Sequence, residues 1–290
     1  MLRGQRAGFA VQDYMMSIAP NPEVGSRIRT GALETNYHDI GSGPPVLFLH
    51  GSGPGVSAWS NWRLPFAKLS GQMRCVAPDL AGFGYTPVPP QWTYSRETWL
   101  EQIVTLLDQL GIGRVSVVGN SFGGAMALAM AVHYPQRVEK LVLMGSVGVS
   151  FPITRGLDLI WGYTPAPENM REVMKVFAFD QSLITEDLIA MRYEASARPE
   201  GAAAYQAMFP EPRQRWVDAL AFDDATLRKI GHETLIVHGR DDAVIPLENS
   251  FNLNKLIDRS QLHVFGRCGH WTQIEHADRF TELVGNFLRP

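Results

Sequence analysis

The chain has 290 residues, 45% of them hydrophobic and 19% charged, with a formal net charge of -3 at pH 7. This composition suffices for a sizeable core but provides neither the basic footprint of a nucleic-acid-binding protein nor the roughly 20-residue apolar run that spans a bilayer. Since Cys75 and Cys268 supply neither a disulfide framework nor a CxxC metal signature, we expect a cytoplasmic protein with no metal or other cofactor.

Residues 1–24 are predicted to be a disordered N-terminal extension, as chain ends commonly are. The segment contains Arg3 and Arg6 but lacks the continuous apolar region of a secretory signal peptide. Met15 and Met16 offer alternative translation starts.

Strand signals and helix signals then alternate along the chain. Short segments bounded by turn residues, most of them apolar, predict strands at residues 26–30, 33–39, 46–50, 74–78, 115–118, 140–144, 234–238 and 261–265. The first two strands form a hairpin around Gly31, and apolar residues at helical spacing predict a helix over 94–110. The alternation predicts an α/β fold with a mostly parallel, eight-stranded sheet flanked by helices.

Residues 150–216 interrupt this alternation. They contain helix signals rich in Met, Phe, Trp, Arg and Pro and no convincing strand, which predicts an inserted helical lid. The core domain is then built from two parts, residues 25–149 and 217–290. Met and aromatic side chains suit the lining of an apolar pocket, although packing of the lid on the core explains most of them equally well.

The segment Gly119–Gly123, with the sequence Gly-Asn-Ser-Phe-Gly, carries the strongest functional signal. It lies between a predicted strand and a run of strong helix formers, which is the context of a nucleophile elbow. In so tight a turn, glycines avoid collisions of a Cβ with the strand or the helix. The helix N-terminus would face the negative charge that develops beside Ser121. The alternative is a Gly-rich turn whose serine merely caps the helix.

An acid and a histidine follow Ser121 in the chain, each just beyond a predicted strand. Asp241 and Asp242 follow one strand, and His270 follows the next. The order Ser, Asp, His is that of α/β-hydrolases, in which the imidazole takes the serine proton and the carboxylate fixes the imidazole tautomer. We predict Asp242 as the carboxylate, because it lies three residues after the strand-ending glycine and four before the proline. An Asx-turn role is the alternative for an aspartate here.

The Gly-rich loop at residues 50–55 lacks the Gly-Lys-Ser/Thr ending of a phosphate loop. In an α/β-hydrolase, this loop supplies one donor of the oxyanion hole. We therefore expect the backbone N–H groups of Ser52 and Phe122 to hold the developing negative oxygen. His50 is then structural rather than catalytic.

Several segments carry a more specific resemblance, and together they cover nearly everything from about residue 33 onward. They are Asn36–Asp39, His50–Gly55, Asn61–Arg63, Gly119–Gly124, Met191–Glu194, Gly239–Asp242 and Gly266–Gln273. On these residues the chain resembles the meta-cleavage product hydrolases, α/β-hydrolases that cleave carbon–carbon bonds in aromatic ring degradation. Asn120 beside the serine and Trp271 after the histidine are more discriminating than the triad. The lid sequence at 147–154 and 161–165 resembles the monocyclic branch, the 2-hydroxymuconic semialdehyde hydrolases.

The resemblance implies a 2-hydroxy-6-oxohexa-2,4-dienoate substrate, which is hydrolysed to 2-hydroxypenta-2,4-dienoate and a carboxylic acid. It assigns the substrate carboxylate to Arg192, although other lid arginines compete with this residue on sequence alone. The remaining expected substrate contacts of this site are Asn61, Asn120, Trp271, Gly53 and Trp161. We further expect a homo-oligomer, a dimer or larger.

Two β-branched residues bear on substrate size. Val147 and Val244 follow strands at the end where the cavity under the lid should lie. The C6 end of the pocket should therefore be narrow, and hydrogen or methyl should be preferred over phenyl. The same chemistry on 6-alkyl or 6-phenyl dienoates, a carboxylesterase and a non-catalytic ligand-binding scaffold are the alternatives.

Overall fold

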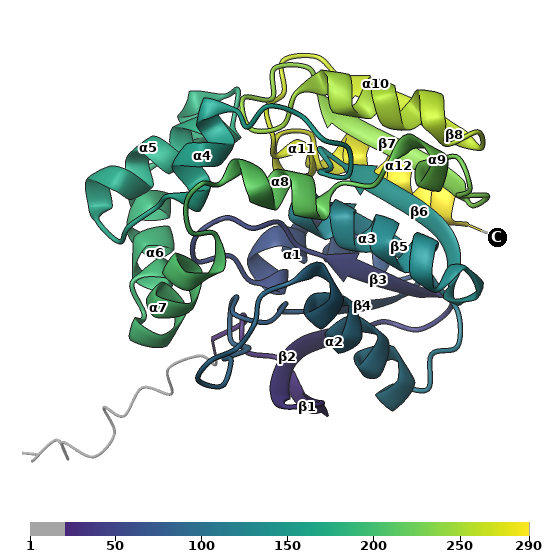
Figure 1. Ribbon diagram of the computed structural model, residues 1–290, viewed down its shortest axis with the longest axis horizontal. Coiled ribbons are helices and arrows are strands. Elements are labelled where there is room, and N and C mark those ends of the chain that lie inside the picture. The colour runs from purple at the N-terminus through teal and green to yellow at the C-terminus, as the bar shows by residue number, and fades with distance from the viewer. Residues whose placement is uncertain (1–20, 290) are drawn as a thin grey trace, which may run out of the picture.

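Within residues 21–289, which the computed structural model describes, eight strands form one sheet (Figure 1). Their order is β1-β2-β4-β3-β5-β6-β7-β8. β2 pairs antiparallel with β1 and β4, and all other neighbours pair in parallel. The strands are β1 Ser26–Thr30, β2 Leu33–Ile40, β3 Pro45–Leu49, β4 Arg74–Pro78, β5 Val115–Asn120, β6 Val138–Met144, β7 Glu233–Gly239 and β8 Ser260–Phe265. The predicted eight-stranded, mostly parallel α/β sheet is confirmed.

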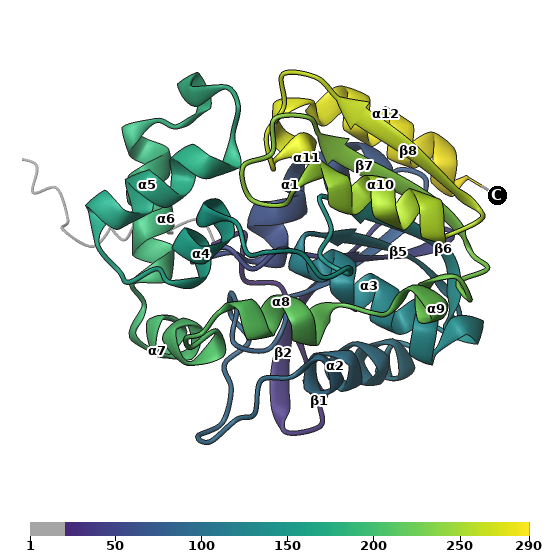
Figure 2. The same ribbon diagram turned by 45° about the horizontal axis from the view of Figure 1, so that its top comes forward.

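Helices cover both faces of this sheet. α1 (Ala58–Leu69) and α12 (Ala277–Leu288) pack together on one face, with the short α11 (Thr272–Glu275) beside them. The other face carries α2 (Arg96–Gln109), α3 (Phe122–His133) and α10 (Leu247–Leu256) (Figures 1 and 2). No helix in this described part of the chain is long and apolar enough to cross a membrane.

The central strands are apolar throughout because both of their faces are buried. Successive side chains of β3 point to opposite faces of the sheet. Val46 and Phe48 pack with side chains of α1 and α12, whereas Leu47 and Leu49 join the larger cluster on the other face. Every residue of β5 is buried, so this strand holds the elbow that follows it in a rigid position.

Of the helices between β6 and β7, the first four gather at one side of the sheet in both views, whereas the last lies beside α10 (Figures 1 and 2). The element order contains no strand in this stretch. The helices are α4 Arg155–Trp161, α5 Pro167–Phe177, α6 Glu186–Ser196, α7 Pro199–Met208, α8 Gln214–Leu220 and α9 Asp224–Leu227. The boundaries of the lid stay a prediction, and α8 crosses residue 216, the expected end of the lid, before it ends at Leu220.

Several element boundaries differ from the expected ones by a few residues, for local reasons. α2 begins at Arg96 rather than at residue 94, because Ser95 caps it. Ser95 Oγ accepts the backbone N–H of Thr98, and the Thr98 hydroxyl accepts that of Ser95, which is a capping box.

The prediction for residues 1–24 falls almost wholly on residues 1–20, outside the described residues.

Candidate active site

Ser121 lies between β5 and α3 in a strained backbone conformation. Its φ of 54° and ψ of -112° are unfavourable for a residue with a Cβ. Strand and helix approach so closely that a Cβ on Gly119 would collide with the backbone of Gly123, and a Cβ on Gly123 with the backbone of Leu49. The two glycines therefore permit the turn, which places the Ser121 side chain at the N-terminus of α3.

His270 lines the same pocket as Ser121, and Asp242 holds its ring. His270 Nδ1 donates to Asp242 Oδ2 at 2.7 Å. Asp242 Oδ1 accepts the backbone N–H groups of Val244 at 2.7 Å and Ile245 at 3.0 Å. With the hydrogen on Nδ1, His270 Nε2 is the nitrogen that can accept the Ser121 proton.

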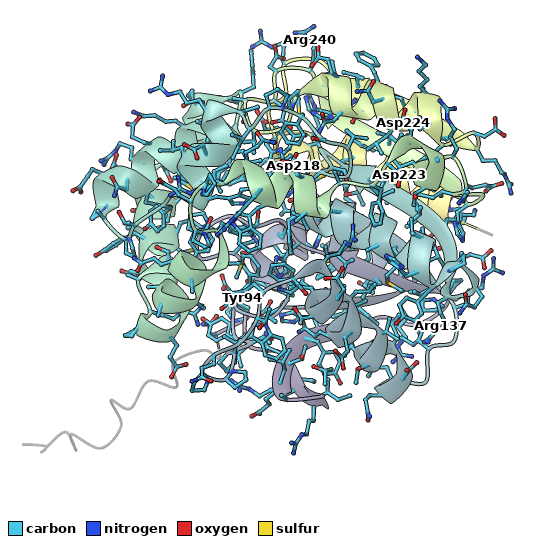
Figure 3. All side chains as sticks on the ribbon, in the orientation of Figure 1. Tyr94, Arg137, Asp218, Asp223, Asp224 and Arg240 are labelled. Atoms are coloured by element: carbon cyan, nitrogen blue, oxygen red, sulfur yellow. The ribbon has the colours of Figure 1, made fainter. Side chains whose placement is uncertain are left out.

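The environment of Asp242 favours its ionised form. Burial raises the pKa of this carboxyl, but the charge of His270 and the hydrogen bonds from His238 and His270 outweigh burial. The pKa of Asp242 consequently lies well below its ordinary value. Asp241 differs, because its partly exposed carboxylate lies 3.4 Å from Arg240, which Figure 3 shows at the outer edge of the molecule. The structure thus brings Asp242, and not Asp241, to His270.

A second histidine, His238 at the end of β7, touches the same carboxylate and was missed by the sequence analysis. Its Nε2 lies 3.2 Å from Asp242 Oδ2 and 3.0 Å from the carbonyl oxygen of Ile245, and its Nδ1 lies 2.6 Å from Ser250 Oγ. A carbonyl oxygen can only accept, so Nε2 carries the hydrogen and Nδ1 accepts the Ser250 hydroxyl. The available signal was a polar residue at the end of an apolar strand, four residues before Asp242.

The lid contacts the loop that carries His270 through Phe177, the last residue of α5. The sequence analysis did not predict this residue. The Phe177 carbonyl oxygen accepts the backbone N–H groups of His270 at 2.7 Å and Trp271 at 3.2 Å. Its ring stacks on that of Trp271, with centroids 4.9 Å apart and 9° between the planes. The apolar spacing of α5 indicates core packing, so the sequence contains no signal for this contact.

The two expected oxyanion donors come from the ends of different strands. Phe122 is the first residue of α3, and its N–H is one of the helix N-terminal donors. The N–H of Ser52 belongs to the Gly51–Ser52 peptide, whose carbonyl oxygen accepts His50 Nδ1–H at 2.7 Å. His50 Nε2 accepts the N–H of Leu80 at 2.9 Å, which fixes this tautomer. Burial lowers the pKa of His50 to about 4, so the ring is neutral at neutral pH and acts as a structural group.

A pocket lies beside Ser121 and His270, under the lid helices α4, α5 and α6. Predicted site residues that line it are Ser52, Gly53, Asn61, Asn120, Ser121, Arg192, Val244, His270 and Trp271. Lining residues that the sequence analysis did not predict for the pocket are Gly51, Val56, Leu157, Ile160 and Phe177. The pocket therefore combines a few polar groups with an apolar wall, as small-molecule sites commonly do.

Val147 and Trp161, which we expected at the pocket, are not among its lining residues. The chain turns at Gly145, where φ is 49° and a Cβ would meet His270. Val147 follows this turn and is buried, and its N–H donates to the carbonyl oxygen of Ser121 at 3.2 Å. Trp161 is buried in the lid instead and donates its Nε1–H to Ser52 Oγ at 2.9 Å.

Arg192 extends from α6 into the pocket as a buried guanidinium, 8% exposed. Nη1 donates to Ser60 Oγ at 3.1 Å, and Nη2 donates to the carbonyl oxygen of Pro54 at 3.0 Å. The buried Nε has no hydrogen-bond partner among residues 21–289. Burial lowers the pKa of Arg192, and both of its hydrogen-bond partners are neutral. The pocket thus contains a positive charge that a bound anion would neutralise.

The order Ser, Asp, His beyond β5, β7 and β8 is the order found in α/β-hydrolases. The sequence profile of the family described as alpha/beta hydrolase fold matches residues 44–277. Residues 21–289 contain no group of three or more His, Cys, Asp or Glu side chains that could hold a metal ion. Fold and site together define a serine hydrolase of the α/β-hydrolase class.

Two curated relatives and a solved structure are similar over almost the whole chain. A 2-hydroxy-6-oxo-2,4-heptadienoate hydrolase of Pseudomonas putida is 56% identical over 268 residues, covering 92% of this chain and 97% of the relative. A 2-hydroxymuconate semialdehyde hydrolase of a Pseudomonas species is 53% identical, covering 92% and 95%. The crystal structure of a variant of a meta-cleavage product hydrolase is 53% identical with a TM-score of 0.91, covering 92% and 98%. The chain belongs to the meta-cleavage product hydrolases, as the sequence resemblance predicted.

Proposed function

We propose that the protein hydrolyses the C5–C6 bond of 2-hydroxy-6-oxohexa-2,4-dienoates that have a small C6 substituent. The products are 2-hydroxypenta-2,4-dienoate and a carboxylic acid, which is formate when the substituent is hydrogen. The observation that carries this proposal is Arg192, a buried guanidinium in the pocket of Ser121 that forms no ion pair with a carboxylate of residues 21–289. The names of the two curated relatives support the substrate class.

Arg192 selects for an acid because a buried charge is costly until an opposite charge accompanies it. A guanidinium also presents donors in a planar fork that matches a carboxylate. Asn61 adds a second polar contact near this end: its Oδ1 accepts the N–H of Gly51 at 3.2 Å, and its buried Nδ2 has no partner within residues 21–289. Asn120 lines the pocket beside Ser121.

The reaction begins with ketonisation of the dienol, in which a proton moves from the 2-hydroxyl group to carbon C5. Ser121 Oγ then attacks the C6 carbonyl while His270 Nε2 takes the serine proton. The N–H groups of Ser52 and Phe122 hold the negative oxygen of the tetrahedral intermediate. When the C5–C6 bond breaks, its electron pair moves toward the 2-oxo group, and the five-carbon product takes up the proton that His270 holds, which makes this histidine neutral again. Water, deprotonated by His270, finally cleaves the ester on Ser121.

Replacing Arg192 with alanine is expected to lower kcat/KM for the dienoate by roughly 30- to 150-fold, the cost of losing a charge-assisted contact of about 2–3 kcal/mol. The kcat/KM of this variant for an uncharged substrate such as 4-nitrophenyl acetate should change little, because this ester has no carboxylate for Arg192 to bind. Steady-state kinetics with both substrates tests this. Arg171→Ala is the matched control, since Arg171 pairs with Glu186 on the lid surface. Equal losses for both substrates would mean that Arg192 supports the lid rather than the acid.

The apolar wall predicts the preferred C6 substituent. The substituent lies beyond the reacting carbonyl, on the side away from the carboxylate. Val244, two residues after Asp242, and Leu157 of α4 line the pocket, and a Cβ on Gly156 would collide with the backbone of Ala243. We infer that these two side chains face the C6 substituent. We expect hydrogen and methyl dienoates to be cleaved roughly ten- to a hundredfold more efficiently than the phenyl dienoate.

Trimming this wall should relax the preference. Val244→Ala and Leu157→Ala should each raise the phenyl-to-methyl ratio of kcat/KM, measured on a panel of dienoates. Val56→Ala is the control, because Val56 lines the pocket two residues from Pro54, the residue that Arg192 contacts. Efficient cleavage of the phenyl dienoate by the unchanged protein would contradict a narrow C6 end.

We also infer a cytoplasmic homo-oligomer, a dimer or larger. Free, buried thiols at Cys75 and Cys268 suit a reducing compartment. Light scattering of the purified protein and fractionation of the producing cells test the two inferences separately.

A further inference from the structure

Ser52 of the core is held by two aromatic side chains of the lid. Trp161 at the end of α4 donates its Nε1–H to Ser52 Oγ at 2.9 Å. The hydroxyl of Tyr205 in α7 lies 2.9 Å from the carbonyl oxygen of Ser52 and 2.7 Å from that of Ile160. Ser52, Trp161 and Tyr205 are all at most 5% exposed, so water does not compete for these contacts.

The same residue is held from the core side. His50 Nδ1–H binds the carbonyl oxygen of Gly51, and this carbonyl shares one planar peptide with the N–H of Ser52. Because Gly51 and Gly53 flank Ser52, the backbone here has more freedom than an ordinary loop. Contacts with neighbouring side chains, His50 on the core side and the two lid aromatics on the other, therefore set the direction of the Ser52 N–H.

We propose that Trp161 and Tyr205 are positioning residues that complete the oxyanion hole when the lid packs on the core. This inference rests on the proposed function, in which the Ser52 N–H stabilises the negative oxygen of the tetrahedral intermediate. We call these two side chains the Ser52 clamp. A donor stabilises a developing charge most effectively when it is fixed in advance, so a loosened Ser52 lowers the rate of attack.

The clamp rings are themselves held by neighbours, so conservative variants should keep the packing. Trp161 stacks on Phe209 with centroids 4.4 Å apart and 10° between the planes. Tyr205 meets Phe83 and Tyr163 edge to face, with centroids 6.3 Å apart in each pair. Tyr205→Phe removes one hydroxyl, and Trp161→Phe removes the donor while it retains an aromatic ring.

Each clamp variant is expected to lower kcat roughly five- to thirtyfold, both for a methyl dienoate and for 4-nitrophenyl acetate. The KM should change less than about twofold, because an oxyanion donor acts mainly on the transition state. Tyr163→Phe is the matched control: its hydroxyl lies in the same lid but pairs with Ser196 Oγ at 2.7 Å, away from Ser52. This control should keep the wild-type kcat.

A double-mutant cycle separates positioning from a general effect on the lid. If Trp161 acts through Ser52 Oγ, Trp161→Phe should have almost no further effect on kcat in a Ser52→Ala background. An undiminished effect in that background, or a wild-type kcat in Tyr205→Phe, would overturn the clamp. Should Trp161→Phe fail to fold, Tyr205→Phe decides alone.

The two substrates also separate the clamp from the proposed function. If the unchanged protein cleaves only the ester, the dienoate proposal is wrong, and the ester kinetics still test the clamp. If the dienoate is cleaved and both clamp variants retain full kcat, the clamp alone is wrong. If the unchanged protein cleaves neither the dienoate nor the ester, both the proposed function and the clamp are wrong.

Discussion

Replacing Ser121 with alanine is expected to abolish hydrolysis of the dienoate while binding of the dienoate is retained. The loss should reach about four to six orders of magnitude in kcat, as is typical when a triad nucleophile is removed. Binding should survive because the proposed carboxylate site, Arg192, and the backbone donors of Ser52 and Phe122 are untouched by the substitution. Single-turnover kinetics and a spectrophotometric titration of the dienoate measure the two effects separately.

Ser116→Ala is the matched control for this variant, because Ser116 is a buried serine of β5, the strand that precedes Ser121. It should keep wild-type turnover. Near-native hydrolysis by the Ser121→Ala variant would disprove the serine mechanism. Loss of ester cleavage with retained dienoate cleavage would show that the elbow serves a carboxylesterase activity only.

The fold could be predicted largely from local signals. Apolar runs that end in Gly, Pro or Asp indicate the central strands, which are buried on both faces, and all eight predicted strands agree with the observed ones to within about two residues. The order of the strands in the sheet could not be predicted in this way. β4 lies between β2 and β3, and this neighbourhood depends on contacts between segments that are far apart in the sequence. The end of α8 at Leu220 was likewise not marked by a glycine or proline.

The candidate site shows the same division. Ser121, Asp242 and His270 could be proposed because each stands directly beyond a strand, where the fold brings side chains together. The contact of Trp161 with Ser52 joins residues 109 positions apart, so no spacing rule predicts it. Val147 was placed at the pocket from its distance to a strand end, but the residue is fully buried and is not among the residues that line the pocket.

Replacing Asp242 with asparagine is expected to lower kcat by about four orders of magnitude, whereas Asp241→Asn should change it less than about twofold. An amide nitrogen in the place of Asp242 Oδ2 could not accept the hydrogen of His270 Nδ1 or that of His238 Nε2. The imidazole would then lose the tautomer that leaves Nε2 free for the serine proton. Steady-state kinetics of both variants at neutral pH measures this, and the reverse ranking would make Asp241 the working carboxylate.

The Asp242→Asn variant should also change the acid stability of the protein. Since the folded state lowers the pKa of Asp242, the carboxylate stabilises the fold fully above the ordinary Asp pKa of about 3.9. This stabilisation is lost as the pH falls through the lower folded-state pKa. The variant lacks the titrating group, so its Tm should fall less steeply than that of the wild type from about pH 4 downward. Asp241→Asn should follow the wild type. Equal slopes for the wild type and Asp242→Asn in thermal melts would show that His238 and His270 do not hold the charged form.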